Sequence, residues 1–104
     1  MVPSDPDFET ALNALAALVG DHVQVLWFSS GTLIGSSGGE LADAVTLKAG
    51  TVEETVMLRI TGGAIVVLER ETFQGYHLHL GADAIEGVDL HVTATAEVRL
   101  TTLP

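Results

Sequence analysis

The sequence predicts an α+β fold, mainly β, in which one N-terminal helix caps a small antiparallel β-barrel or roll of about six or seven strands. Three observations support this fold class: a helical apolar pattern near the start, short β-branched and aromatic segments separated by turn residues over 22–100, and a shortage of crossover helices. A parallel sheet would need such helices, and only residues 40–48 could supply a short one. The 104 residues are 47% hydrophobic and contain no linker or repeat, which favours a single domain over 1–104.

The helix is predicted over residues 4–20. Ser4 or Asp5 can cap its exposed backbone N–H groups, and Pro6 suits a first turn, where its missing N–H is not needed. Spacings of four, three and four residues place one apolar stripe on Phe8, Leu12, Leu15 and Val19. Gly20 then provides a left-handed stop.

Antiparallel strands are predicted over 22–100. The individual segments are 22–28, 32–36, 44–48, 56–61, 64–70, 76–80 and 88–100. The serine and glycine residues of 37–39 are typical of a loop. In 88–100 apolar and polar residues alternate throughout, which predicts one long strand with a buried face and a wet face.

The clearest pairing is a hairpin between 56–61 and 64–70. Gly62 and Gly63 lie between these segments and can adopt the positive φ values of a tight primed turn. A two-residue loop places Ile60 opposite Ile65 and Leu58 opposite Val67.

Two stretches follow a pattern of a helix ending in glycine, an alternating strand, and a second strand that contains a bend glycine. They are 18–25 (LVGDHVQV) and 30–35 (SGTLIG). This pattern resembles the opening of the Sm/Lsm-like small β-barrel family, and 79–88 resembles that family's strand, single helical turn and closing strand. The resemblance implies a barrel shape and edge-to-edge oligomerisation. It does not imply RNA binding, because Asp43 lacks the asparagine that closely follows in the family, and the second RNA motif is absent.

Charge and composition limit the partners that we expect. The chain has fourteen acidic and four basic residues, which gives a net charge of −10. The bases are Lys48, Arg59, Arg70 and Arg99. So few bases disfavour binding to nucleic acid or to an anionic membrane. The chain has no cysteine, begins with an acidic segment unlike a secretory signal, and lacks a long lipid-compatible segment. We therefore expect a cytoplasmic protein.

A group of histidines near the C-terminus is the strongest candidate for metal chemistry. His77 and His79 are two residues apart on a strand and share one face. Suppose that 76–80 pairs with 88–93 and that the numbers of opposite residues add up to about 168–170. His77 or His79 then lies opposite His91, with Asp89 nearby. Three imidazoles and a carboxylate could hold Zn²⁺ in tetrahedral geometry.

Two other interpretations of the same histidines stay open. They can be polar residues on the wet face of an amphipathic hairpin, in which case no cofactor is needed. They can also form a pH-responsive surface, since histidine ordinarily titrates near ~6.5, and the oligomeric state would then change between about pH 5.5 and 8.

Trp27 and Phe28 are candidate interface residues. As neighbours on one strand they point to opposite faces, so that one contributes to the core and the other is exposed or covered. The cover can come from this chain or from another subunit.

No catalytic constellation is visible in the sequence. Residues 35–39 are rich in glycine but lack the lysine of a phosphate-binding loop, and no serine lies in a nucleophile-elbow motif. The sequence therefore predicts a non-catalytic assembly or protein-binding module that self-associates as a homo-oligomer. The alternatives are a small-ligand-binding barrel, or a metal-binding protein that uses His77, His79 and His91.

Overall fold

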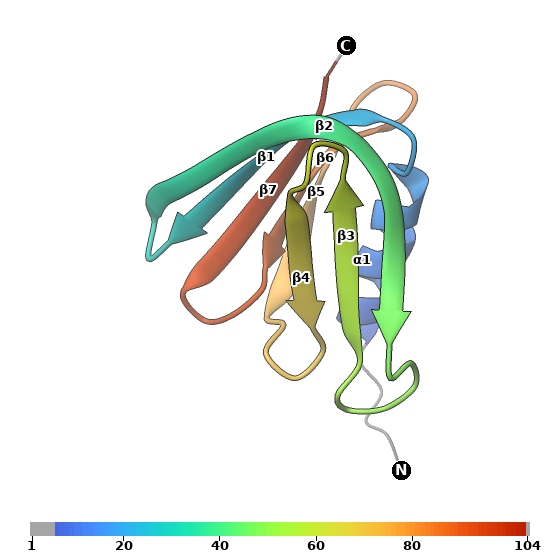
Figure 1. Cartoon of the computed structure of the whole chain (residues 1–104), viewed down its shortest axis with the longest axis vertical. Coiled ribbons are helices and arrows are strands. Elements are labelled where there is room, and N and C mark those ends of the chain that lie inside the picture. Colours follow the sequence, from blue (N-terminus) through green and yellow to red (C-terminus); the bar gives the residue numbers. More distant parts are fainter. Residues whose placement is uncertain (1–5, 104) are drawn as a thin grey trace.

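The computed structural model describes residues 6–103 and confirms the predicted fold class: one helix is followed by seven antiparallel strands in one sheet (Figure 1). The elements are α1 (Pro6–Ala17), β1 (His22–Ser29), β2 (Thr32–Leu47), β3 (Thr55–Ile60), β4 (Ile65–Glu69), β5 (Gly75–Leu80), β6 (Ile85–His91) and β7 (Ala96–Thr102). The strand order is β4-β3-β2-β1-β7-β6-β5. The sheet is strongly curved but not closed, because β4 and β5 lie at its two edges and do not pair with each other.

The long strand β2 arches over the molecule and belongs to both halves of the sheet (Figure 1). Its first half pairs with β1 up to Glu40, and its second half pairs with β3 from Leu41 onward. The loop predicted at 37–39 is therefore wrong, since these residues pair with β1, and the strand predicted at 44–48 is the end of β2. Serine and glycine mark a bend within the strand here, not an interruption of it.

Gly39 shows why the bend requires glycine. A Cβ atom at this position would overlap the carbonyl oxygen of Thr61 and lie 2.9 Å from its Oγ1. Thr61 is fixed there because its N–H donates to the carbonyl of Glu40 at 2.9 Å and its Oγ1 accepts from the Glu40 N–H at 2.8 Å. The two halves of the sheet thus meet at a backbone contact that leaves no room for a side chain.

The predicted hairpin is present, but its register is shifted by one residue. Leu58 lies opposite Val66, not Val67, and Ile65 lies opposite Arg59, not Ile60. Burial explains the shift: Leu58 and Val66 are both in the core, whereas Ile65 and Val67 are exposed, and opposite residues share a face. The connection is correspondingly longer than two residues, with the Ile60 N–H bonded to the Ala64 carbonyl.

The single long strand predicted over 88–100 is also wrong, because residues 92–95 form a tight turn between β6 and β7. The Thr93 hydroxyl accepts hydrogen bonds from the N–H groups of Thr95 (3.2 Å) and Ala96 (3.0 Å). The threonine hydroxyl thus performs the role that an asparagine or aspartate side chain usually performs in a turn. The alternation of apolar and polar residues continues through the turn and so conceals it.

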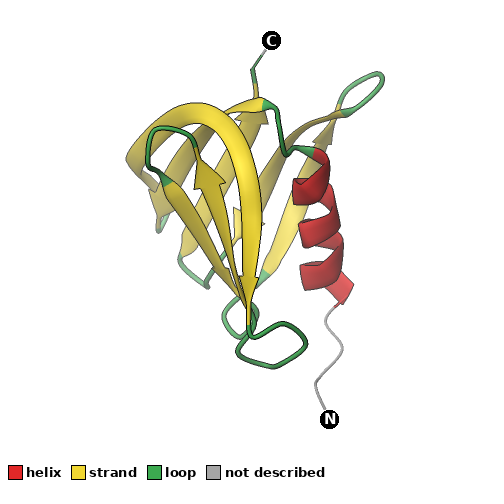
Figure 2. Cartoon of the chain, turned by 45° about the vertical axis from the view of Figure 1, so that its right-hand side comes forward, coloured by secondary structure: helices red, strands yellow, loops and turns green. Residues whose placement is uncertain are grey.

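The helix ends earlier than predicted and is rotated relative to the predicted stripe. Its buried face consists of Phe8, Ala11, Ala14 and Leu15, and the buried Leu18 follows directly after the helix. Val19, predicted to be in the core, is 42% exposed, and Leu12 is only partly buried. The two alanines allow close approach of α1 to β5 and β6, where the helix packs (Figure 2). The predicted caps Ser4 and Asp5 lie outside the described residues.

The core is one cluster of buried apolar side chains from α1 and the concave side of the sheet, including Val25, Leu58, Leu90 and Leu100. Within residues 6–103, α1 is too short and too polar to span a bilayer, and it is the one helix there.

Candidate functional site

The predicted zinc ligands all lie on the face of β5 and β6 that points away from the core, here called the outer face. His77 is opposite Asp89 and His79 is opposite Gly87, while His91 is opposite Gly75. The register that would have placed His77 or His79 opposite His91 is therefore wrong. Instead, the His79 Nε2 lies 2.9 Å from the Asp89 Oδ2, and the rings of His77 and His79 meet edge to face at 5.0 Å.

Strand β7 adds two charged residues to this group. The Nε of Arg99 donates to the Glu97 carboxylate at 2.7 Å and lies 3.8 Å from Asp89, while the Nδ1 of His91 lies 3.4 Å from Glu97. We refer to His79, Asp89, Arg99, Glu97 and His91 as the outer ladder. Two imidazoles each adjoin a carboxylate, and both carboxylates adjoin the same guanidinium, so the charges compensate one another across three strands.

The outer ladder does not assemble a metal-ligand set. Among residues 6–103, no three histidine, aspartate or glutamate side chains are grouped closely enough to hold a metal ion. His91 contacts Glu97 and not the other two histidines of the zinc hypothesis. The geometry thus supports the interpretation of these residues as a charged, solvent-facing surface better than the interpretation as a zinc centre.

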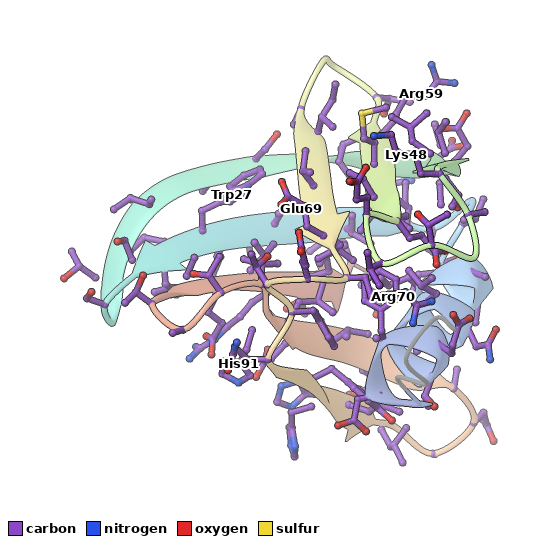
Figure 3. The ribbon with its side chains drawn as sticks, turned by 90° about the horizontal axis from the view of Figure 1, so that it is seen from below. Trp27, Lys48, Arg59, Glu69, Arg70 and His91 are labelled. Carbon is purple, nitrogen blue, oxygen red and sulfur yellow. The ribbon has the colours of Figure 1, made fainter. Side chains whose placement is uncertain are left out.

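Trp27 and Phe28 point to opposite faces of β1, as predicted, and both are partly buried. Trp27 packs against the core between Val98 on β7 and Gly35 on β2 (Figure 3). Phe28 lies on the outer face, where the Arg99 guanidinium covers its ring at 4.6 Å from the centroid. The outward-pointing ring of Phe28 is thus covered at least partly by a side chain of this chain.

A surface depression of about 430 Å³ adjoins Phe28 at the end of the outer ladder. Its lining includes His91, Glu97 and Arg99 together with the two neighbouring turns. These three charged groups already pair with one another. The depression therefore offers a ligand less charge than its residue types alone would indicate.

All four basic side chains of the chain form ion pairs. Lys48 pairs with Glu53 at 2.6 Å, Arg59 with Asp43, Arg70 with Glu54 at 2.7 Å and also with Glu9, and Arg99 with Glu97. Figure 3 shows that Lys48, Arg59 and Arg70 come from the β2–β4 half of the molecule. Each base is therefore locally neutralised, and these side chains present little unpaired positive charge at the surface.

Arg59 and Asp43 form a two-pronged contact across β3 and β2. The Arg59 Nε donates to the Asp43 Oδ1 at 2.6 Å, and its Nη2 donates to the other oxygen. These hydrogen bonds hold the pKa of Asp43 below its ordinary value, and they raise the pKa of Arg59. The contact stabilises the fold above the ordinary aspartate pKa, and this contribution is lost as the pH falls through the lowered value.

The substitution Arg59→Ala tests this contact. We expect the pKa of Asp43 to rise back toward its ordinary range, because the hydrogen-bond donors are gone. Measurement of the Asp43 side-chain carboxyl chemical shift by NMR during a pH titration checks this. Since both side chains are exposed, the loss of stability at neutral pH should be small. An unchanged Asp43 midpoint would show that the contact does not persist in solution.

The outer face of β2, β3 and β4 carries a surface that sequence reasoning missed. Register places Val45, Met57 and Val67 side by side in one row across the three strands. Beside this row, Ile65 on β4 is 49% exposed, and Val67 itself is 47% exposed. One sequence signal was available: residues 65–68 are four successive apolar residues, so a strand here exposes apolar side chains on one face whichever face is buried.

This apolar row ends at a free sheet edge. Within the described residues, β4 pairs with β3 on one side and with no strand on the other. Natural edge strands are usually protected by short length, by charged side chains or by proline, and β4 has five residues with one charge, Glu69, at its end and neither proline nor lysine. The Glu69 carbonyl already accepts from the N–H groups of Thr72 and Phe73, so the apolar part of the strand is the part with a free edge. We call the row Val45–Met57–Val67, the neighbouring Ile65 and the free edge of β4 together the β4 surface.

No protein-family model matches this chain, and neither a curated protein nor a solved structure is found to be similar to it. The resemblance to Sm/Lsm-like barrels therefore stays a prediction.

Proposed function

We propose that this protein is a non-catalytic β module that self-associates, and that its copies bind one another through the β4 surface. The observation that carries the proposal is the coincidence of exposed apolar side chains with a strand edge that no other strand of the described residues covers. Ile65 and Val67 are each about half exposed on the edge strand itself. Burial of such side chains against a second copy removes apolar area from water and satisfies the free backbone groups together.

A second copy is the occupant that this proposal requires, because an edge strand can pair antiparallel with the same strand of another copy about a two-fold axis. The apolar row is flanked by the mutually neutralising pair of Arg59 and Asp43 at one end of the strands and by Glu69 at the other. The net charge of −10 on each copy opposes association over longer distances, so salt should strengthen binding by screening this repulsion.

The alternative of a small-ligand-binding barrel has less support. Such a barrel needs a cavity inside, but the concave side of this sheet is filled by the buried apolar cluster. The cytoplasmic location expected from the absence of cysteine stays part of the proposal.

The substitution Val67→Lys tests the proposal. We expect the wild-type mass in light scattering to exceed 10.9 kDa and to rise with concentration. In the variant the dissociation constant should increase by about 10- to 100-fold or more, because an apolar contact is lost and a charge enters the interface.

Thr101→Lys is the matched control. It adds the same charge at an exposed position on the outer face of β7, beside Gly87 of β6 and remote from β4 in the sheet order. The dissociation constant of the Thr101→Lys variant should not increase as that of Val67→Lys does. Both variants should retain the wild-type circular dichroism spectrum. A wild-type protein that stays at 10.9 kDa at millimolar concentration would overturn the proposal.

A further inference from the structure

We infer that the outer ladder is a pH-sensitive switch that holds the edge strand β5 more tightly at acidic pH. Its central element is the contact between His79 of β5 and Asp89 of β6, which becomes an ion pair when His79 is protonated. The inference does not depend on the proposed function, because β5 and β4 lie at opposite edges of the sheet.

With neutral histidines, the outer ladder has more negative than positive charge. Asp89 and Glu97 each carry a negative charge, and Arg99 carries the positive charge that adjoins both. The guanidinium is not shared equally, because its Nε lies 2.7 Å from the Glu97 carboxylate but 3.8 Å from that of Asp89. Asp89 is therefore the carboxylate with the weaker charge compensation at neutral pH.

His79 is placed to supply the missing positive charge. Its Nε2 lies 2.9 Å from the Asp89 Oδ2, and protonation of the imidazole converts this contact into a charge-assisted hydrogen bond. The Asp89 side chain is only 18% exposed, which limits the screening of this interaction by water, while that of His79 is about half exposed. Protonation therefore strengthens the contact by the modest amount that is typical of a partly exposed ion pair.

Two further histidines lie on the same face. The ring of His77 meets that of His79 at 5.0 Å, so simultaneous protonation of the two adds a repulsion that reduces the gain. His91 has its Nδ1 3.4 Å from the Glu97 carboxylate. Because Arg99 already bonds that carboxylate at 2.7 Å, protonation of His91 stabilises the ladder less than protonation of His79 does.

The remaining charged groups near His79 leave the sign of the effect unchanged. On β7, Arg99 opposes a positive charge on His79, but it is itself bonded to the Glu97 carboxylate, which offsets it. On β6, the Glu86 carboxylate lies beside Gly81, at the end of the β5–β6 hairpin. Helix α1 packs against the opposite, core-facing side of β5 and β6. The charge that His79 meets at hydrogen-bond distance is thus the carboxylate on β6.

The ion pair exists only in the folded chain and only at acidic pH. Histidine ordinarily titrates near ~6.5, so the pair is present below about pH 6 and is lost as the pH rises above about 7. Its contribution therefore favours folding on the acidic side of this range. Below about pH 4 an aspartate is protonated in turn, and the contribution disappears again.

A double-mutant cycle at two pH values tests the inference. The wild-type protein, His79→Gln, Asp89→Asn and the double variant are unfolded in urea at about pH 5.5 and pH 8, at one protein concentration and one ionic strength, and circular dichroism follows the unfolding. Glutamine and asparagine keep polar side chains that do not ionise. The coupling between the two positions, expressed as a factor in the unfolding equilibrium constant, should be about 2- to 5-fold larger at the lower pH.

His22→Gln is the matched control. It makes the same substitution at an exposed histidine of β1, which is separated from β6 by β7 in the sheet order. The ratio of its unfolding constants at the two pH values should equal that of the wild-type protein. In His79→Gln the same ratio should shift, with stability lost mainly at the lower pH.

Three results would overturn the inference. The first is a coupling between His79 and Asp89 that is equal at the two pH values or larger at the higher one. The second is a His22→Gln variant whose pH dependence changes as much as that of His79→Gln, because a general charge effect would then explain the result. The third is a His91→Gln variant with a larger change than His79→Gln, since the pH-sensitive contact would then lie at the other end of the ladder.

Discussion

Replacement of Arg70 by alanine is expected to destabilise the fold by about 3–5 kcal/mol. The Arg70 side chain is 9% exposed, and that of its partner Glu54 is 7% exposed. The guanidinium bonds Glu54 through two nitrogens, pairs with Glu9 of α1, and lies 4.8 Å from the centroid of the Phe8 ring. Without it, a buried carboxylate loses its counter-charge, and the contact between α1 and the β3–β4 half of the molecule is broken.

Urea unfolding followed by circular dichroism measures this loss. Arg59→Ala is the matched control, because it removes an arginine from an ion pair in which both side chains are largely exposed, and it should cost much less stability than Arg70→Ala. Arg70→Lys should recover only part of the loss, since lysine keeps the charge but not the planar array of donors. A cost for Arg70→Ala as small as that for Arg59→Ala would contradict the assigned role.

Gly39→Ala is expected to destabilise the fold by about 1–3 kcal/mol, and by more if the strand cannot shift. The added methyl group would overlap the Thr61 carbonyl and lie 3.1 Å from Cγ2 of Ile60, and Gly39 also has a φ of 158°. Because the obstacle is mainly backbone, the bend has little freedom to relax.

The adjacent glycine provides the control for this prediction. A Cβ atom at Gly38 would meet its nearest neighbour, the Val23 carbonyl oxygen, at 3.8 Å, an ordinary contact. Gly38→Ala should therefore leave the melting temperature nearly unchanged, whereas Gly39→Ala should lower it by about 4–8 °C for each kcal/mol lost. Equal effects of the two substitutions would show that the close approach at Thr61 does not determine the bend.

The fold class was predictable because alternation and helical periodicity report which side of an element is buried. They report less about where an element stops. Residues 37–39 have a loop composition but pair with β1, and residues 92–95 continue the alternation of a strand although they turn. In both cases a local pattern is outweighed by contacts with distant residues: the Thr61 backbone at the bend, and the pairing of β7 with β1.

The candidate sites show the same limit. The alternation of side chains along a strand correctly placed His77, His79 and Asp89 on one face. The register between their strands depends instead on the turn and on burial, and it differs from the prediction. The cover of Phe28 by Arg99 joins residues far apart in sequence that neighbouring strands bring together. The β4 surface was missed because its row becomes continuous only when β2, β3 and β4 lie in that order.

The arch formed by β2 has a mechanical consequence. The backbone of β2 runs without interruption from the half of the sheet around β1 to the half formed with β3 and β4, so that no loop separates these two halves. The two halves are thus held together by strand pairing on both sides of the bend, β1 before it and β3 after it. Two copies joined through β4 would extend this curved surface from one molecule into the next.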